Sequence, residues 1–428
     1  MFRRALLLTR GNAALWRRRI LFVAGGIVVG LLAVSMARLA DVSQWAFAQT
    51  YARWPWCPFL ITPAGFALSA YLTRKFFQGA QGSGIPQVMA ARQLERTEDR
   101  ARLVSPRLGI AKIGLLMLGL LSGASSGREG PTVQVGAATM FLLGRLEPHR
   151  QPGLLLAGAA AGVAAAFNAP LAGIIFGIEE MSRSFEQRSS VLVLATVITA
   201  GLVSLAILGD YTYFGVSQGT LPRGWQWLCV PVCLLVGGLL GGLFSRLVVA
   251  SANGVHSVMS LVVRYPVAAA AACGLGVAAC GAISEGTIFG TGYEQAQLVL
   301  GGHAVPWLFG PLKLVATMLS AMSGIPGGIF SPSLAVGAGL GYDLSWMLPG
   351  VPVGTLAILC MASYLAGVVQ APLTSAVIVS EMTADHSLIL PVMICALGAS
   401  FVSRLICKEG IYQLLAARLL SDFKPSSN

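Results

Sequence analysis

Acidic side chains stand within apolar sequence at two places in the chain. Glu129 lies in "SSGREGPTVQVGA" (Ser125–Ala137), between two apolar runs, and Glu179 and Glu180 follow the apolar run "APLAGIIFGI". A carboxylate is costly to keep ionised in apolar surroundings, and acids placed there are most often functional. The chemistry open to these side chains is the uptake and release of protons.

Glu129 stands two residues before Pro131, in a Gly-rich turn of the kind that starts a helix. A helix start exposes unpaired N–H groups and about half a positive charge, so a carboxylate is favoured there. That carboxylate can accept hydrogen bonds from the same N–H groups that an anion would use, and its side chain can swing away from them when it is protonated. We interpret Glu129 as a gate that also carries a proton. The alternative is a plain helix cap held by Arg128.

Glu179 and Glu180 are adjacent, so their charges repel each other and at least one favours protonation. A carboxyl that favours protonation near the cytoplasmic mouth of the pathway would suit proton transfer. The alternative is a solvated helix end followed by Arg183, and the two interpretations are about equally favoured. Lys112 and Lys313 could pair with acids or attract anions, but snorkelling to the surface is slightly favoured.

The pattern of a Gly-rich turn, a Pro and an apolar run recurs along the chain. It occurs in "GSGIP", "GREGP" and "GGIFSP", and "FNAP" (Phe167–Pro170) is a fourth candidate. Helix starts within hydrocarbon need partners for their N–H groups, and an anion is such a partner. Converging helix starts therefore predict a site for a small anion, built without a fully buried cation.

The composition places the elements that carry these motifs in a membrane. Only 11% of the 428 residues are charged, against about 25% in a typical soluble domain. The net charge of +12 fits Arg and Lys gathered in cytoplasmic loops, and nucleic-acid binding is a poor alternative. The Cys and His residues form no metal constellation, so no metal or cofactor is expected. Apolar runs suited to spanning a bilayer include Leu21–Ala37, Ile110–Ser122, Val191–Leu208, Leu228–Phe244, Val267–Ile283 and Leu388–Phe401.

The chain contains an internal repeat. Lys112–Ala137 aligns with Lys313–Ala338 at an offset of 201 residues (313 − 112), matching Lys, Gly and Pro as well as apolar residues. "APLAGIIFGIEEM" aligns with "APLTSAVIVSEMT", and "GSGIPQ" resembles "GTGYEQ". The sequence thus predicts a duplicated all-α polytopic membrane protein with broken helices.

Charge predicts that the two halves are inverted. Both termini are basic and are expected in the cytoplasm, whereas the nearly uncharged linker is expected outside. Each half then crosses the membrane an odd number of times, and the site is expected near the midplane between the repeats. The expected divisions are a basic amphipathic helix (1–20), a first repeat (21–208), an external linker (209–226), a second repeat (227–406), and a C-terminal helix with a short tail (407–428).

The motifs "GSGIP", "GREGP" and "GGIFSP", in this order and with "APLAGIIFGIEEM", resemble those of the CLC chloride channels and chloride/proton transporters. The resemblance extends over nearly the whole chain and is closest to bacterial members without nucleotide-binding domains. It implies a homodimer in the cell inner membrane with one ion pathway in each subunit.

The resemblance also implies roles for particular residues. Ser83 and Tyr412 would offer hydroxyls to a central anion, and the backbone N–H groups of Ile329 and Phe330 would complete its site. Glu129 would be the external gate and Glu180 the internal proton-transfer acid, with Glu179 beside it. The motif residues Gly84, Arg128 and Gly130 are assigned to the anion-binding set.

The acid at position 180 favours chloride/proton antiport, because the channel branch of the family usually lacks it. The alternative is a passive chloride channel, gated by voltage or pH, on the same fold. An enzyme is disfavoured because the spans carry no nucleophile with a base and no metal ligands. A cation/proton antiporter is also disfavoured, since the helix starts would turn positive ends toward the ion.

Overall fold

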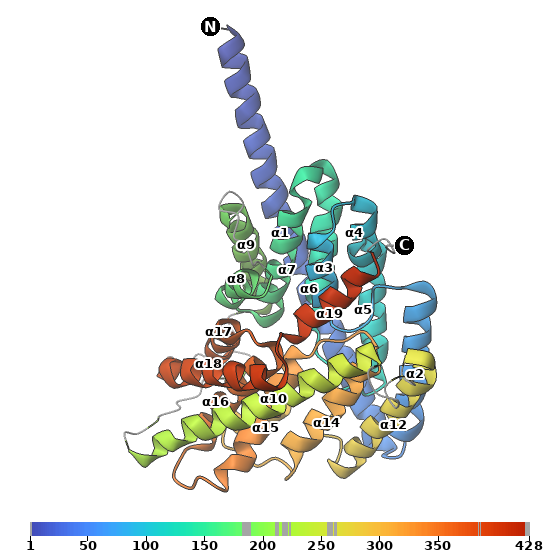
Figure 1. Ribbon diagram of the computed structural model, residues 1–428, viewed down its shortest axis with the longest axis vertical. Helices are drawn as coiled ribbons and strands as arrows, with labels where there is room; N and C mark the ends of the chain where they lie inside the picture. Colours follow the sequence, from blue (N-terminus) through green and yellow to red (C-terminus); the bar gives the residue numbers. More distant parts are fainter. Residues whose placement is uncertain are drawn as a thin grey trace.

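The protein is almost entirely helical in the computed structural model, which describes side chains from residue 16 onward (Figure 1). The described residues, among which there is no β-strand, are 2–181, 190–209, 214–215, 221, 224–254, 260, 263–383, 385 and 387–423. The helices of the N-terminal half are α1 (Phe2–Arg53), α2 (Pro58–Phe76), α3 (Ile85–Gln93), α4 (Thr97–Val104), α5 (Pro106–Leu121), α6 (Glu129–Leu143), α7 (Gln151–Phe167), α8 (Pro170–Glu179) and α9 (Ser190–Leu208), with short 3-10 turns η1 (Gly144–Leu146) and η2 (Pro148–Arg150). Those of the C-terminal half are η3 (Trp225–Leu228), α10 (Cys229–Asn253), α12 (Pro266–Ile283), α13 (Tyr293–Leu300), α14 (Phe309–Met322), α15 (Phe330–Ser345), α16 (Val353–Val369), α17 (Pro372–Thr383), α18 (Ile389–Ile406) and α19 (Ile411–Ser421).

This chain is a polytopic all-α membrane protein. Six of its described helical stretches are long and apolar enough to cross a bilayer, and all six apolar runs predicted from the sequence fall on them. Other apolar helices are shorter, with 10 to 17 residues. Such short helices begin or end inside the protein, where broken helices are tolerated because other protein groups surround their ends.

Each predicted helix start is a helix start in the structure. α3 follows "GSG", α8 begins at Pro170, and α6 and α15 begin two residues before Pro131 and Pro332. Proline fits the first turn because its missing N–H would have no acceptor inside the helix. The turn chemistry read from the sequence therefore places four helix ends correctly.

The repeat is visible in matched helix pairs. Asn168 caps the end of α7 and Gln370 caps the end of α16, both in the left-handed conformation with φ of 52° and 61°. Each is followed by Ala-Pro and a short helix, α8 or α17. The two halves of the chain therefore interrupt their helices at equivalent positions, as the internal repeat predicts.

Helix α1 joins the predicted N-terminal helix (1–20) to the first membrane span without a break, and its start extends beyond the remaining helices (Figure 1). The Arg17 guanidinium donates a hydrogen bond to Glu147 in the turn between α6 and α7, and this bond lowers the pKa of the Glu147 carboxyl. Most of the predicted linker (209–226) lies outside the described residues. Helix α19 is the predicted C-terminal helix.

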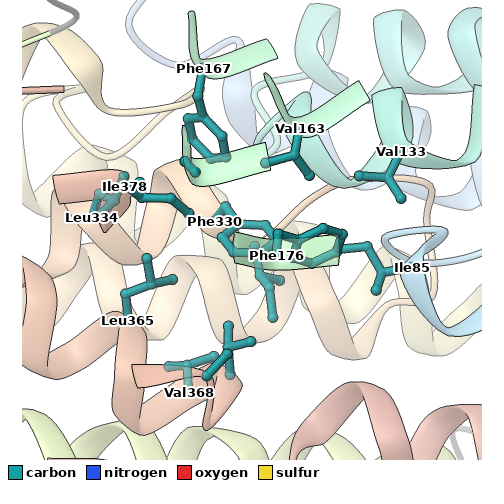
Figure 2. Close-up of a cluster of buried hydrophobic side chains, with 14 of the residues drawn as sticks. Ile85, Val133, Val163, Phe167, Phe176, Phe330, Leu334, Leu365, Val368 and Ile378 are labelled. Carbon is teal, nitrogen blue, oxygen red and sulfur yellow. The ribbon is translucent and has the colours of Figure 1, made fainter. Parts of the chain in front are cut away.

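The core between the two halves is lined by aromatic rings. The Phe330 ring packs edge-on against Phe167 and Phe176, with centroid separations of 5.8 and 6.2 Å. Figure 2 shows these rings within one cluster of buried apolar side chains from several helices. Phe330 belongs to the first turn of α15, so this core holds that helix start in place.

Candidate ion-transport site

The starts of α3, α6 and α15 meet at one place. Gly127 and Gly328, just before α6 and α15, exchange two backbone hydrogen bonds of 2.8 and 2.7 Å. The N–H of Gly327 donates to the carbonyl of Gly82, before α3, at 3.0 Å. A Cβ on Gly130 would lie 2.9 Å from Ser83 Cβ. Three positive helix ends therefore converge, as the motifs predict.

Gly84 is required by the backbone at this junction. It precedes α3 with φ of +96°, a conformation that side chains disfavour. A Cβ there would also lie 2.6 Å from Cβ of Gln134. Gln134 is itself fixed, because its side-chain amide donates to the carbonyls of Gly79 and Leu103. Gly84 thus shapes the site rather than supplying a side chain to it.

Lys112 and Lys313 hold the Gly-rich turns. Both are fully buried, so neither snorkels to the surface. Lys112 Nζ donates to the carbonyls of Ala80 and Gly82 at 2.8 and 2.6 Å, and Lys313 Nζ donates to those of Ile288 and Gly290 at 2.8 and 2.7 Å. The same arrangement occurs in both repeats: a buried lysine donates hydrogen bonds to backbone carbonyls and so fixes the turn that precedes a helix.

Two hydroxyls lie beside the converging helix starts. Tyr412, in the first turn of α19, is 1% exposed, and its phenol oxygen has no hydrogen-bond partner among the described residues. The Ser83 side chain is close to this oxygen but makes no hydrogen bond of good geometry with it, and the charges of Glu180 and Glu129 act on it from nearby. A buried phenol costs free energy when its donor is unused, so an external ligand is expected to accept from it.

Ile329 and Phe330 complete one wall of this region. Ile329 is the buried N-cap of α15 and Phe330 is its first residue, so their N–H groups have no acceptors inside the helix. The rings of Phe330 and Tyr412 lie 6.0 Å apart. The arrangement places helix amides, a phenol and apolar ring surface together, which suits a weakly hydrated anion.

Glu129 lies at the start of α6 and is 0% exposed. Its Oε1 accepts a 2.7 Å hydrogen bond from the Tyr293 phenol, whereas its Oε2 has no partner among the described residues. A Cβ on Gly127 would lie 2.4 Å from that Oε2. The carboxyl is therefore held between the starts of α6 and α15, and the hydrogen bond on it comes from a phenol.

Arg128 turns away from Glu129 toward α1. Its Nη1 donates to the carbonyl of Ala37 at 2.8 Å and to Asp41 Oδ1 at 2.7 Å. The guanidinium also lies above the Tyr293 ring, 5.8 Å from its centroid. Among the described residues its salt bridge is with Asp41. The alternative interpretation, a helix cap in which Arg128 holds Glu129, required an ion pair between those two residues, and the structure does not show it.

A cavity of about 310 Å³ opens beside these groups. It is lined by Ala37, Arg38, Asp41, Arg128, Leu208, Tyr293 and Gln297. Tyr293 thus lies between the cavity and the buried Glu129 carboxyl. The cavity therefore ends at the phenol that contacts the gate carboxyl.

The two adjacent acids have different surroundings. Both oxygens of Glu179 accept backbone N–H groups at the start of α17, from Leu373 at 3.0 Å and Thr374 at 2.6 Å. Glu180, the C-cap of α8, is buried, whereas Glu179 is only partly so, and Glu180 lies near Tyr412. The carboxylate of Glu179 therefore caps the start of α17, whereas Glu180 lies near the phenol of Tyr412.

A family model for voltage gated chloride channels matches residues 65–404, which is most of the chain. The chain belongs to this family. H(+)/Cl(-) exchange transporter ClcA of Yersinia pseudotuberculosis serotype IB (strain PB1/+) is 32% identical, over 92% of this chain and 86% of the relative. The protein of the same name from Klebsiella pneumoniae (strain 342) is 31% identical, over 92% and 87%.

Solved structures of voltage gated chloride channel family members share the fold. A slow cyanobacterial Cl-/H+ antiporter superposes with a TM-score of 0.80 at 25% identity, covering 95% of this chain and 98% of the other. A CLC-type fluoride/proton antiporter gives 0.78 at 23% identity, covering 94% and 98%. At that identity the second comparison concerns the fold alone.

The fold of this voltage gated chloride channel family member brings most of the predicted residues together. Ser83, Gly84, Gly130, Ile329, Phe330 and Tyr412 gather at the helix starts, with Glu129 beside them. The side chain of Arg128 points elsewhere, and Glu179 serves as a cap. Tyr293, Asp41 and Glu381 are site neighbours that were not predicted. Tyr293 lies in "GTGYEQ", whose likeness to "GSGIPQ" was the available signal.

Proposed function

We propose that this chain exchanges chloride for protons across the bacterial inner membrane. The observation that supports this function most strongly is the convergence of three helix starts on buried hydroxyls, with Glu129 and Glu180 both near Tyr412. The amides and hydroxyls suit a halide, and the acids suit a proton. The exchange activity in the names of the relatives agrees with this assignment.

In the proposed mechanism Glu129 competes with chloride. While it is ionised, its carboxylate occupies the outer part of the pathway and excludes the anion. Protonation neutralises it and removes its attraction to the helix ends, so chloride can enter. The proton then passes toward Glu180. Since the two acids are on different helices, transient water is proposed to join them.

We further propose that the protein works as a homodimer with one pathway in each subunit and with both termini in the cytoplasm. Large apolar side chains are exposed on α8, α9, α17 and α18, including Leu171, Ile198, Leu373 and Phe401. A partner subunit or lipid would cover them. By the resemblance to the CLC family, a serine rather than a proline at position 83 supports chloride over nitrate as the preferred anion.

The test is to measure chloride and proton movement together in liposomes that contain the purified protein. An imposed chloride gradient should drive protons against their own gradient. We expect Glu129→Gln to let chloride pass while proton movement stops, because the amide cannot carry a proton. Glu180→Gln should also uncouple the two ions. Chloride flux that neither drives protons nor responds to them would indicate the passive channel instead.

A further inference from the structure

Two hydroxyl groups form a chain that ends on the gate acid. The Tyr293 phenol donates to Glu129 Oε1 at 2.7 Å, and its oxygen lies 2.8 Å from Oγ of Ser331. Tyr293 begins α13, and Ser331 belongs to the first turn of α15. Residues from three separate helices therefore form one chain of hydrogen bonds that ends on a carboxylate oxygen.

The direction of this chain follows from the number of hydrogens. A phenol has one O–H to donate, and here it is given to the carboxylate of Glu129. Ser331 must then donate to the oxygen of Tyr293. Both hydroxyl hydrogens are thus directed toward the negative charge, which strengthens the bond to the ionised carboxylate.

Other positive groups near the carboxyl are engaged elsewhere. Arg128 is paired with Asp41, and Lys313 donates to two backbone carbonyls. Arg38 lines the cavity of about 310 Å³ beside Tyr293, which in the proposed mechanism is the outer cavity, and does not contact the buried carboxyl. The hydroxyl chain is therefore the direct restraint on Oε1, and it leaves the other oxygen of Glu129 without a partner among the described residues.

Tyr293 is also fixed from its outer side. Arg128 lies above its ring, and the ring of Phe214 packs at a centroid distance of 5.4 Å. The same side chain lines the outer cavity, whereas Glu129 is 0% exposed. A rigid aromatic side chain thus separates the gate carboxyl from the cavity and presents a single donor to it.

We propose that Tyr293, oriented by Ser331, is a latch that holds the ionised carboxylate of Glu129 in the closed position. This proposal rests on the proposed function, in which the carboxylate and chloride compete. Tyr293 is a positioning residue that acts through Glu129. Because chloride binds only the fraction of protein whose gate is released, a stronger latch weakens the apparent affinity for chloride.

The test is calorimetric titration of chloride into the purified protein in detergent, which does not depend on transport. Tyr293→Phe keeps the ring and removes only the donor. We expect the apparent Kd for chloride to fall by about tenfold, the size of one hydrogen bond to a charged group. Tyr364→Phe is the matched control, because it removes a buried phenol on which, unlike that of Tyr412, neither Glu129 nor Glu180 acts electrostatically. It should leave the Kd unchanged.

A double-mutant cycle separates a latch from a general structural role. In a Glu129→Gln background the competing charge is absent, so Tyr293→Phe should no longer change the Kd. Ser331→Ala in the natural background should tighten chloride binding less than Tyr293→Phe does. An equal effect of Tyr293→Phe in both backgrounds would overturn the latch.

Two further outcomes would also overturn it. An unchanged Kd in Tyr293→Phe would show that the phenol does not restrain the gate, and weaker binding would make Tyr293 an anion ligand instead. Neither result affects chloride/proton exchange, which the liposome measurement tests separately. Conversely, the titrations could confirm the latch while the liposome measurement showed chloride moving without protons. The latch proposal would then be kept and the exchange proposal rejected.

Discussion

At the scale of single residues, the proposed anion site is built from partial charges. The nearby full positive charges are engaged: Lys112 and Lys313 donate to backbone carbonyls, and Arg128 pairs with Asp41. What remains for an anion are helix-start amides and the hydroxyls of Ser83 and Tyr412. Such donors hold a halide without binding it too tightly for release.

A prediction at this scale concerns the phenol of Tyr412. Tyr412→Phe removes the donor and keeps the ring beside Phe330. We expect the Kd for chloride to rise about tenfold, the effect of one lost hydrogen bond to a charged ligand. Chloride titration of the purified protein measures it, and an unchanged Kd would remove Tyr412 from the anion site. The expected change is opposite in sign to that of Tyr293→Phe, so the two phenols serve as controls for each other.

The sequence predicts which residues gather but not all of their contacts. Ser83 stands in a Gly–Pro motif at a helix start, so its position follows from local chemistry, whereas Tyr412 is predicted only through the resemblance to the family. The bond between Tyr293 and Glu129 joins residues 164 positions apart. Its geometry depends on how α13 packs against α15, which no local pattern specifies.

At the scale of elements, α8 and α17 cap each other. Glu179, at the end of α8, accepts N–H groups at the start of α17, and Glu381, near the end of α17, accepts those of Leu171 and Ala172 at the start of α8, at 3.1 and 2.6 Å. The four bonds satisfy donors that a helix start leaves unpaired. Two short helices, each too short to span the bilayer, are thereby fixed as one unit beside Glu180.

We expect Glu381→Gln to destabilise this unit. The amide loses the charge and one of the two acceptors, so the free energy of unfolding should fall by about 1–3 kcal/mol. Glu179→Gln should cost a similar amount, because its contacts mirror those of Glu381. The midpoint of thermal unfolding in detergent measures both effects.

The control for the cap is Glu95→Gln, which neutralises an exposed acid in the loop between α3 and α4. Its midpoint should match that of the natural protein. If Glu381→Gln also matched it, the reciprocal cap would not contribute to stability. The matching pair Glu179 and Glu381 lies within aligned segments of the repeat, yet their crossed bonding requires the antiparallel packing of the two helices.

At the scale of the whole molecule, the duplication could be predicted well from the sequence. Lys, Gly and Pro matched at one offset because each has a backbone role: Lys112 and Lys313 hold turns, and the Gly–Pro motifs start helices. The direct contact between repeats, from Gly127 to Gly328, could not be predicted, since it depends on the relative placement of the halves.

The inversion of the halves gives a prediction about two equivalent loops. The loop after α3 carries exposed Arg96, and its counterpart after α13 carries Trp307, which is 80% exposed. The stretch from Arg92 to Arg107, which includes this first loop, is rich in Arg, whereas residues 301–308 have no Lys or Arg, so the positive-inside rule places the two loops on opposite sides. We expect Arg96→Cys to react with a membrane-impermeant maleimide only from the cytoplasmic side, and Trp307→Cys only from the outside.

The natural chain is the control for this labelling, because its cysteines are all free but buried or partly buried. In intact cells only the Trp307→Cys protein should gain the mass of the reagent, and in inverted vesicles only the Arg96→Cys protein should. Labelling of both loops from one side would contradict inverted repeats. The helix starts of the two halves would then point the same way along the membrane normal, and they could not face one another across a shared anion.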